Sequence, residues 1–178
     1  MTAADKYYLK AKDCYPYEIE DALEALEYGL SHDDSHAPLL ALKGEIYYQD
    51  LKRFPAAIEY FELALYHDAA YVGAYYNYIK LLCEIDEMKQ AEKMISRALG
   101  IKGIDRAKVL HLEAMMYEQQ GMYTIALSSL SSALFHCRDK EDTSFYTDEV
   151  KRVKKKSKSA KSKETVSEPE SVQVGEVL

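Results

Sequence analysis

The sequence contains no tryptophan and only three cysteines, four prolines and seven glycines among its 178 residues. Cys14, Cys83 and Cys137 are too few and too widely spaced for a disulfide framework or a zinc knuckle, so we expect reduced thiols and a cytoplasmic protein. No apolar run approaches the roughly 18 residues that span a bilayer. The N-terminus also lacks the apolar core of a secretion signal, and we therefore expect no membrane segment.

Motifs that carry catalysis are missing as well. The sequence has no glycine-rich phosphate loop and no HExxH zinc motif. The segment from His32 to His36, with sequence His-Asp-Asp-Ser-His, has the residue types of a metal loop. However, it falls at a predicted turn, where Ser, Asp and His are common. We therefore predict no catalytic residue, no metal site and no cofactor, and we expect that the protein is not an enzyme.

Charge is divided unevenly along the chain. Residues 151–163 carry 8 of the 23 Lys and Arg residues, and residues 164–178 carry 4 of the 30 Asp and Glu residues. The first 150 residues therefore hold 15 basic against 26 acidic residues. An acidic body disfavours nucleic acid over most of its surface and favours neutral or basic ligands. The 16 tyrosines suit a surface that both packs and binds, because a tyrosine ring can be buried while its hydroxyl stays in water.

A pattern of Ala-x3-apolar-x2-small-Leu occurs four times. Its leading alanines are separated by 35, 34 and 35 residues and are Ala22, Ala57, Ala91 and Ala126. A fixed period near 34 indicates one supersecondary unit stacked on copies of itself. Such a helical repeat is typical of an interaction scaffold rather than of a single pocket built for chemistry.

Each unit is predicted to be a pair of amphipathic helices, which we name helix A and helix B. Helix A is indicated by three positions at i, i+4 and i+7, which lie on one helical face. These triads are Tyr7/Ala11/Cys14, Leu40/Gly44/Tyr47, Tyr75/Ile79/Leu82 and Leu110/Ala114/Tyr117. Helix B is expected to open three residues before each alanine, at Ile19, Phe54, Met88 and Tyr123. Pro38 fits the first turn of a helix, and Gly121 fits a left-handed helix end.

The chain is therefore predicted to form a solenoid over residues 1–141. The expected repeats are about 5–36, 37–70, 71–104 and 105–138. Residues 142–156 are expected to form a capping helix, started by Asp142 or Thr143, that covers the end of the stack. Residues 157–178 have no period and are expected to be a disordered tail.

These columns resemble the tetratricopeptide repeat (TPR), whose pattern is W-x2-L-G-x2-Y followed by A-x3-F and P. Residues 40–65 match best, with Gly44, Tyr47, Ala57 and Phe61 in the places of the pattern. The fourth unit also matches, the third departs at Ile79 and Leu82, and the first is weakest. The usual Trp and closing Pro are missing. The resemblance covers about residues 5–137 and implies an all-α, right-handed solenoid whose A helices line a concave groove.

The resemblance also implies that partners dock in this groove as extended peptides or helices. The residues expected on the groove face are Ala41, Glu45, Tyr48, Tyr76, Asn77, Lys80, Cys83, Lys108, His111, Met115 and Glu118. Family members that bind chaperone tails use a clamp of Lys, Asn and Arg residues around two carboxylates. Here only Asn77 and Lys108 match that clamp, while Ala41, Glu45 and Leu112 do not, so we expect no binding of such tails.

The function favoured by the sequence is a non-catalytic adaptor for protein–protein interaction that captures a peptide or helix in its groove. The alternative is a nucleic-acid- or ribosome-associated factor that uses the basic segment 151–163. That segment has no interleaved aromatic residues to stack on bases, which disfavours the alternative. The sequence does not indicate the identity of the partner or the oligomeric state.

Overall fold

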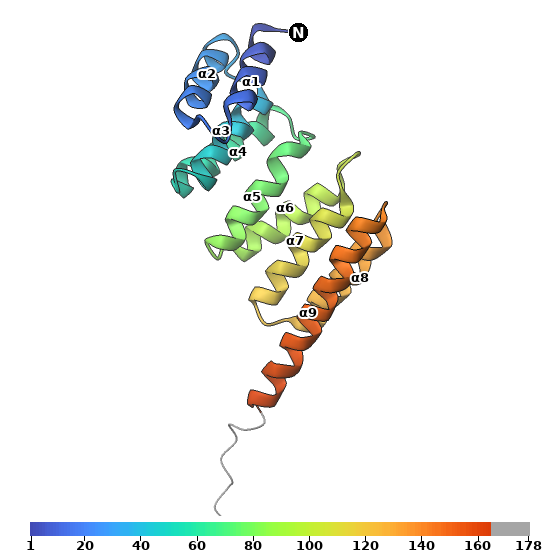
Figure 1. Cartoon of the computed structure of the whole chain (residues 1–178). Helices are drawn as coiled ribbons and strands as arrows, with labels where there is room; N and C mark the ends of the chain where they lie inside the picture. Colours follow the sequence, from blue (N-terminus) through green and yellow to red (C-terminus); the bar gives the residue numbers. More distant parts are fainter. Residues whose placement is uncertain (165–178) are drawn as a thin grey trace, which may run out of the picture.

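The computed structural model describes residues 1–164, and within them the fold consists of nine α-helices without a strand (Figure 1). The helices are α1 (Ala3–Cys14), α2 (Ile19–His32), α3 (Ala37–Gln49), α4 (Phe54–His67), α5 (Val72–Glu84), α6 (Met88–Leu99), α7 (Arg106–Gln119), α8 (Tyr123–His136) and α9 (Lys140–Glu164). The first eight form four antiparallel hairpins that follow one another along the stack. This arrangement confirms the predicted all-α helical-repeat solenoid.

The four B helices begin at the residues predicted from the repeat, which are Ile19, Phe54, Met88 and Tyr123. Pro38 lies in the first turn of α3, as expected, because this position needs no amide hydrogen. The four leading alanines of the B helices are fully buried. Helix α1 has 12 residues, close to the 13 or 14 of the other A helices, although the first unit matches the TPR pattern least well.

Small side chains allow helices A and B to approach closely. A Cβ atom at Gly44 would lie 3.0 Å from two ring carbons of Phe61, so glycine at this position lets α3 contact the Phe61 ring directly. Ala11 and Ala114 occupy the same place in the first and fourth repeats and are buried. In the third repeat this place holds Ile79, and α5 and α6 accordingly approach each other less closely than the helices of the other repeats. Repeat three is therefore the most widely spaced hairpin of the stack.

The turns from helix A to helix B share a left-handed residue. Lys52, Asp86 and Gly121 have φ angles of +53°, +65° and +74° and each lies five residues before the leading alanine of its repeat. The following amide donates a hydrogen bond to a carbonyl of the preceding helix, as from Met122 to Tyr117. This geometry ends helix A sharply and reverses the chain. The first repeat instead has a cis peptide bond between Tyr15 and Pro16.

Helix α9 occupies the place of a fifth helix A. Tyr146 and Val153 are buried, and with the partly buried Val150 they repeat the i, i+4, i+7 triad of the other A helices. These side chains pack against α7 and α8. The stack thus ends on half a repeat, and the polar outer face of α9 covers the apolar end.

The bounds of α9 correct the prediction for the C-terminal segment. The helix runs from Lys140 to Glu164 rather than from 142 to 156, so residues 157–164 are helical instead of disordered. It is started by Asp139, whose carboxylate accepts a hydrogen bond of 2.8 Å from the amide of Asp142. Lysine and alanine are good helix formers, so the helix can continue after its last apolar contact. The remainder of the expected tail, residues 165–178, lies outside the described residues.

Candidate partner-binding groove

The inner face of the stack is formed by the A helices, because α1, α3, α5 and α7 contact one another in sequence. A cleft of about 270 Å³ opens on this face where α3, α5 and α7 meet. Its lining residues are Tyr48, Lys80, Cys83, Glu84, Leu112, Met115 and Gln119. Four of the predicted groove residues are thus brought together from three repeats, namely Tyr48, Lys80, Cys83 and Met115. Sequence reasoning missed Glu84, Leu112 and Gln119, although each lies one helical turn after a predicted residue.

The walls of this cleft are largely apolar. Leu112 and Tyr48 are buried, whereas the Met115 side chain is 46% exposed. Burial raises the pKa of the Cys83 thiol to about 11, so this cysteine is neutral at physiological pH and behaves as a small apolar group. A partner would therefore meet a hydrophobic surface at the centre of the groove.

Most polar groups around the cleft already have partners. The hydroxyl of Tyr48 donates a hydrogen bond of 2.8 Å to Glu84 Oε2, and burial together with this carboxylate raises the pKa of the phenol. Gln119 Nε2 donates a hydrogen bond of 3.2 Å to the backbone carbonyl of Cys83. Lys80, which is exposed, has no hydrogen bond or ion pair with any residue in the range 1–164. Its charge acts to lower the pKa of Glu45, and its amine is the cation of the cleft that a ligand carboxylate can contact.

Towards the N-terminal end of the groove, an amide network surrounds Glu45. Gln49 Nε2 donates hydrogen bonds of 3.2 Å to Asn77 Oδ1 and 3.4 Å to Glu45 Oε1. Burial is the main cause that raises the pKa of Glu45, and a hydrogen bond from Asn77 opposes this shift. Ala41 is 5% exposed and belongs to the floor of the groove rather than to its contact surface. This end of the groove is thus more polar than the cleft.

Tyr76 and Lys108 join the third repeat to the fourth. The amide of Asp105 donates a hydrogen bond of 2.9 Å to the Tyr76 hydroxyl. The Lys108 amine lies 4.3 Å from the centroid of the Tyr76 ring, within the range of a cation–π contact. Lys108 is therefore engaged by the protein itself.

The C-terminal end of the groove is partly occupied by α9. His111 Nε2 lies 3.2 Å from Glu149 Oε2, and the rings of Phe145 and Tyr146 pack edge-on against His111. Glu118 is 7% exposed and accepts hydrogen bonds from Arg152 and Lys156. His111 and Glu118, both predicted as groove residues, are thus held by the capping helix.

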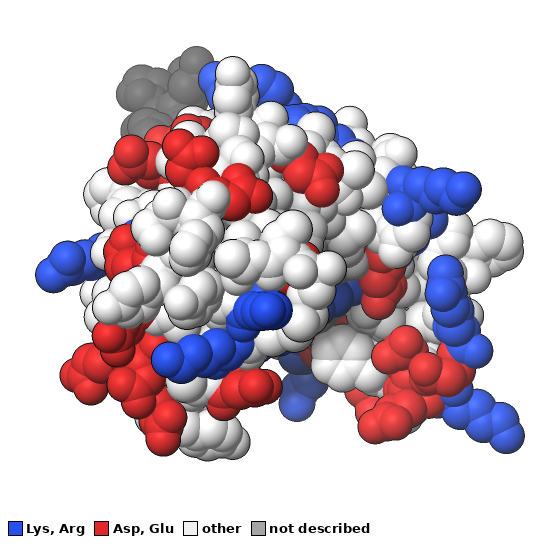
Figure 2. Space-filling model, turned by 90° about the horizontal axis from the view of Figure 1, so that it is seen from above, with Lys and Arg blue, Asp and Glu red and all other residues white. Residues whose placement is uncertain are grey.

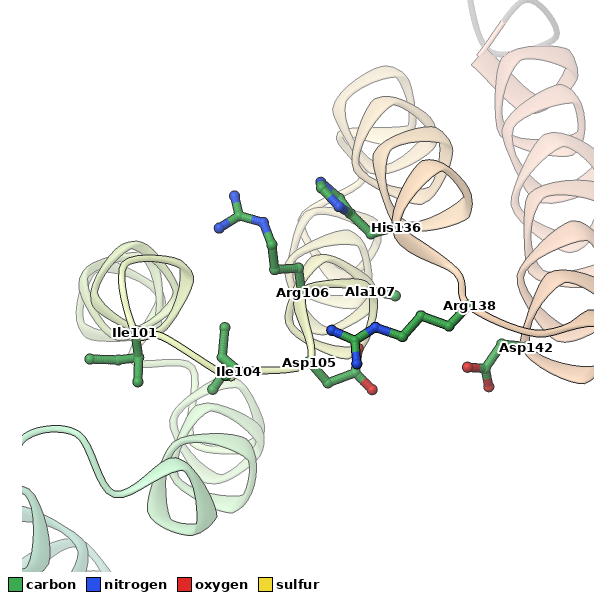
Figure 3. Close-up of a pocket in the computed structure, with 9 residues that line it drawn as sticks. Ile101, Ile104, Asp105, Arg106, Ala107, His136, Arg138 and Asp142 are labelled. Carbon is green, nitrogen blue, oxygen red and sulfur yellow. The ribbon is translucent and has the colours of Figure 1, made fainter.

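A separate pocket of about 340 Å³ lies between the N-terminal end of α7 and the C-terminal end of α8 (Figure 3). Two arginines, Arg106 and Arg138, and two aspartates, Asp105 and Asp142, line it. Arg106 donates a hydrogen bond of 2.6 Å to the carbonyl of Leu99, and Asp105 caps α7. The pocket thus lies where the α6–α7 link meets the α8–α9 link, and its charged side chains include groups with structural roles there.

The segment from His32 to His36 forms a turn with two caps. The Asp33 carboxylate accepts hydrogen bonds from the amide and hydroxyl of Ser35. His36 caps α3 through Nδ1 and contacts Asp5 through Nε2 at 3.1 Å. Among residues 1–164 no group of three or more His, Cys, Asp or Glu residues is placed to hold a metal ion.

The face at the N-terminal end of the stack carries groups of acidic side chains with basic side chains between them. Viewed from above, it shows acidic and basic side chains interspersed (Figure 2).

In the part of the chain that the structure describes, no helix is both long enough and apolar enough to cross a bilayer.

Comparison with solved structures places the architecture among helical-repeat solenoids. No family model matches the sequence, and no curated protein matches it. PilF of Pseudomonas aeruginosa superposes with a TM-score of 0.74 at 18% identity, over 86% of this chain and 70% of that chain. A MamA structure superposes with a TM-score of 0.65 at 18% identity, over 96% and 98% of the two chains. MamA residues 41–end from Desulfovibrio magneticus RS-1 give a TM-score of 0.65 at 16% identity, over 89% and 97%.

PilF and MamA are both TPR proteins. The likeness over most of each chain, together with the four hairpins of period 34 to 35, identifies the fold of this protein as the tetratricopeptide-repeat fold. The sequence-based resemblance to this repeat is thereby confirmed at the level of the fold.

Proposed function

We propose that the protein is a non-catalytic adaptor that binds a segment of a partner protein, as a peptide or a helix, in the groove formed by α3, α5 and α7. The observation that supports this most directly is the cleft at their junction, which is lined by apolar side chains and left uncovered by α9. The Met115 side chain is 46% exposed at the centre of this inner face, beside the cleft. Methionine at a binding surface adapts to varied shapes, which suits this role.

The contrast between the two ends of the groove supports the same proposal. At α9, the inner face of α7 is covered by ion pairs and aromatic contacts. At α3 and α5, the equivalent strip has no covering helix among the described residues. A partner segment bound there would continue the packing that α9 provides for repeat four.

A photo-crosslinking side chain at Met115 tests this function. We expect it to capture a defined partner from a lysate of the source organism. The same group at Tyr66 is the matched control, since that side chain is 82% exposed on α4, a B helix. Capture from position 66 with none from position 115 would contradict binding in the groove.

A second candidate function is contact with an anionic partner such as RNA through α9. The supporting observation is that the helix continues through residues 157–164, which aligns five lysines on its outer face. They are Lys151, Lys154, Lys155, Lys158 and Lys161. Replacing all five by glutamine should abolish binding to a duplex RNA probe. With the original lysines, affinity should fall steeply between 50 and 200 mM salt, because counterions compete for the phosphates.

A further inference from the structure

We infer that the cleft between α3, α5 and α7 selects a partner segment in which a large apolar side chain stands next to a carboxylate side chain. The inference rests on the proposed groove function and specifies the chemistry of the ligand. It is carried by the apolar walls of the cleft and by a single lysine at its rim.

The size and lining of the cleft define the apolar half of the ligand. A volume of about 270 Å³ is just below the lower limit of small-molecule sites and has room for one large side chain such as Leu, Met or Phe. Leu112, Met115, the neutral thiol of Cys83 and the ring of Tyr48 surround this space. A polar side chain bound there would lose its hydrogen bonds to water without gaining new ones.

The polar groups at the rim of the cleft define the charged part of the ligand. The Glu84 carboxylate is bonded to Tyr48, and the Gln119 amide is bonded to the backbone of Cys83. Of the charged groups that line the cleft, Lys80 is the one without a hydrogen bond or ion pair within residues 1–164. A ligand carboxylate placed at this amine is attracted to it, whereas a lysine or arginine at the same place is repelled. The negative charges of Glu84 and Glu45 act in the opposite direction, so the ligand carboxylate must lie at Lys80 and away from Glu84.

The same polar groups favour an Asp or Glu side chain over the carboxylate of a chain end. A chain end beside an acidic side chain needs two separate sets of donors. The next lysine along the groove, Lys108, lies over the Tyr76 ring, and the charge of Lys80 itself acts to lower the pKa of Glu45. One available amine therefore matches one carboxylate.

Three synthetic peptides test the inference with the full-length protein. Each carries a central Leu-Phe pair, blocked ends and a fluorescent label, and the residue before the pair is Glu, Gln or Lys. Fluorescence anisotropy should give a Kd for the Glu peptide about fivefold lower than for the Gln peptide, with the Lys peptide weakest. In the Lys80→Glu variant this order should invert. Lys89→Glu, the same charge change at an exposed site on α6, should leave it unchanged.

Alkylation of Cys83 reports where the peptides bind. In a Cys14→Ser, Cys137→Ser background, the Glu peptide should slow the reaction of Cys83 with N-ethylmaleimide. Met115→Asp should remove both this protection and the binding, and circular dichroism verifies that each variant is folded.

The possible results separate the inference from the function on which it rests. Equal affinity for the three peptides, with Cys83 protected by all of them, overturns the carboxylate preference and leaves groove binding intact. Binding without protection of Cys83 overturns the assignment of the cleft. Binding that appears only in a chain ended at Glu164 overturns the partner as occupant and assigns the cleft to residues 165–178 of the same chain.

Discussion

The ion-pair cluster that fastens α9 to α7 allows a stringent test of the packing described above. Arg152→Met removes the guanidinium group, which donates hydrogen bonds of 2.7 and 2.6 Å to the two oxygens of Glu118. Methionine retains the apolar stem of the side chain, so the change acts mainly on charge. The Glu118 side chain is only 8% exposed, so removal of Arg152 leaves a nearly buried carboxylate with Lys156 as its remaining partner.

The magnitude follows from the burial of the two partners. Breaking a buried ion pair by removing one member costs about 3–5 kcal/mol. Here the Arg152 side chain is 47% exposed and Lys156 still bonds Glu118 at 2.9 Å, so solvent and the second cation reduce the loss. We expect the free energy of unfolding to fall by ~2 kcal/mol at pH 7. Lys151→Met is the matched control, because Lys151 pairs with Asp148 where both side chains are about 70% exposed, and it should change the free energy by less than ~0.5 kcal/mol.

Urea unfolding followed by circular dichroism measures both variants, and amide exchange in α9 locates the effect. The direction in which the stabilisation by Arg152 changes with pH can also be predicted. The hydrogen bond from Arg152 is the main cause that lowers the folded-state pKa of Glu118 below its ordinary 4.5. The stabilisation by Arg152 is therefore complete above the unfolded-state pKa and is lost as the pH falls through the lowered pKa in the folded protein. Equal stability of the two variants at pH 7, or a difference that persists unchanged to pH 3, would refute this reasoning.

Three further tests address other parts of the structure, the first two by the same unfolding assay. Gly121→Ala should lower the free energy of unfolding by ~1 kcal/mol, because Gly121 has a φ of +74° and open space around it. Lys52→Gly should raise the free energy of unfolding by ~0.5–1 kcal/mol, because Lys52 has a φ of +53°. Opposite signs would contradict the shared turn geometry. Gly44→Ala should cost ~1–3 kcal/mol, since the added methyl group lies 3.0 Å from the Phe61 ring, and a neutral result would mean that α3 and α4 are not in close contact. Alkylation of Cys83, followed by mass spectrometry, should accelerate about tenfold per pH unit between pH 8 and 10, as expected for a thiol whose pKa is about 11; a plateau near pH 9 would contradict its burial.

Much of the fold was predictable because its determinants are local and repeated. The period of the small residues specified the four hairpins, and the apolar residue three places before each alanine marked the start of every B helix. The end of α9 was not predictable in this way. Its last turns have no apolar period, and Lys156 is fastened to Glu118, 38 residues earlier in the chain. A pairing over that distance depends on how α9 docks, which a periodic pattern does not encode.

The groove was predictable to a similar degree. Helical spacing alone brought Tyr48, Lys80, Cys83 and Met115 to one face, and the structure places them around one cleft. Spacing could not indicate that His111 and Glu118 are engaged by α9. Both lie on the inner face of helix A, so the sequence treats them like the uncovered positions. Which positions of that face remain open depends on the cap, and the open stretch from α3 to α7 is where we propose that the partner binds.

The bulky Ile79 between α5 and α6 has a mechanical consequence. The hairpins on either side bring helix A and helix B together at a glycine or alanine, whereas in the third hairpin the fully buried Ile79 side chain lies between the two helices. We expect bending of the stack to be concentrated at this hairpin, because its two helices lie farther apart than those of the other repeats. Lys80 and Cys83 belong to this third hairpin. Such bending would therefore widen or narrow the cleft in which we propose that the partner segment binds.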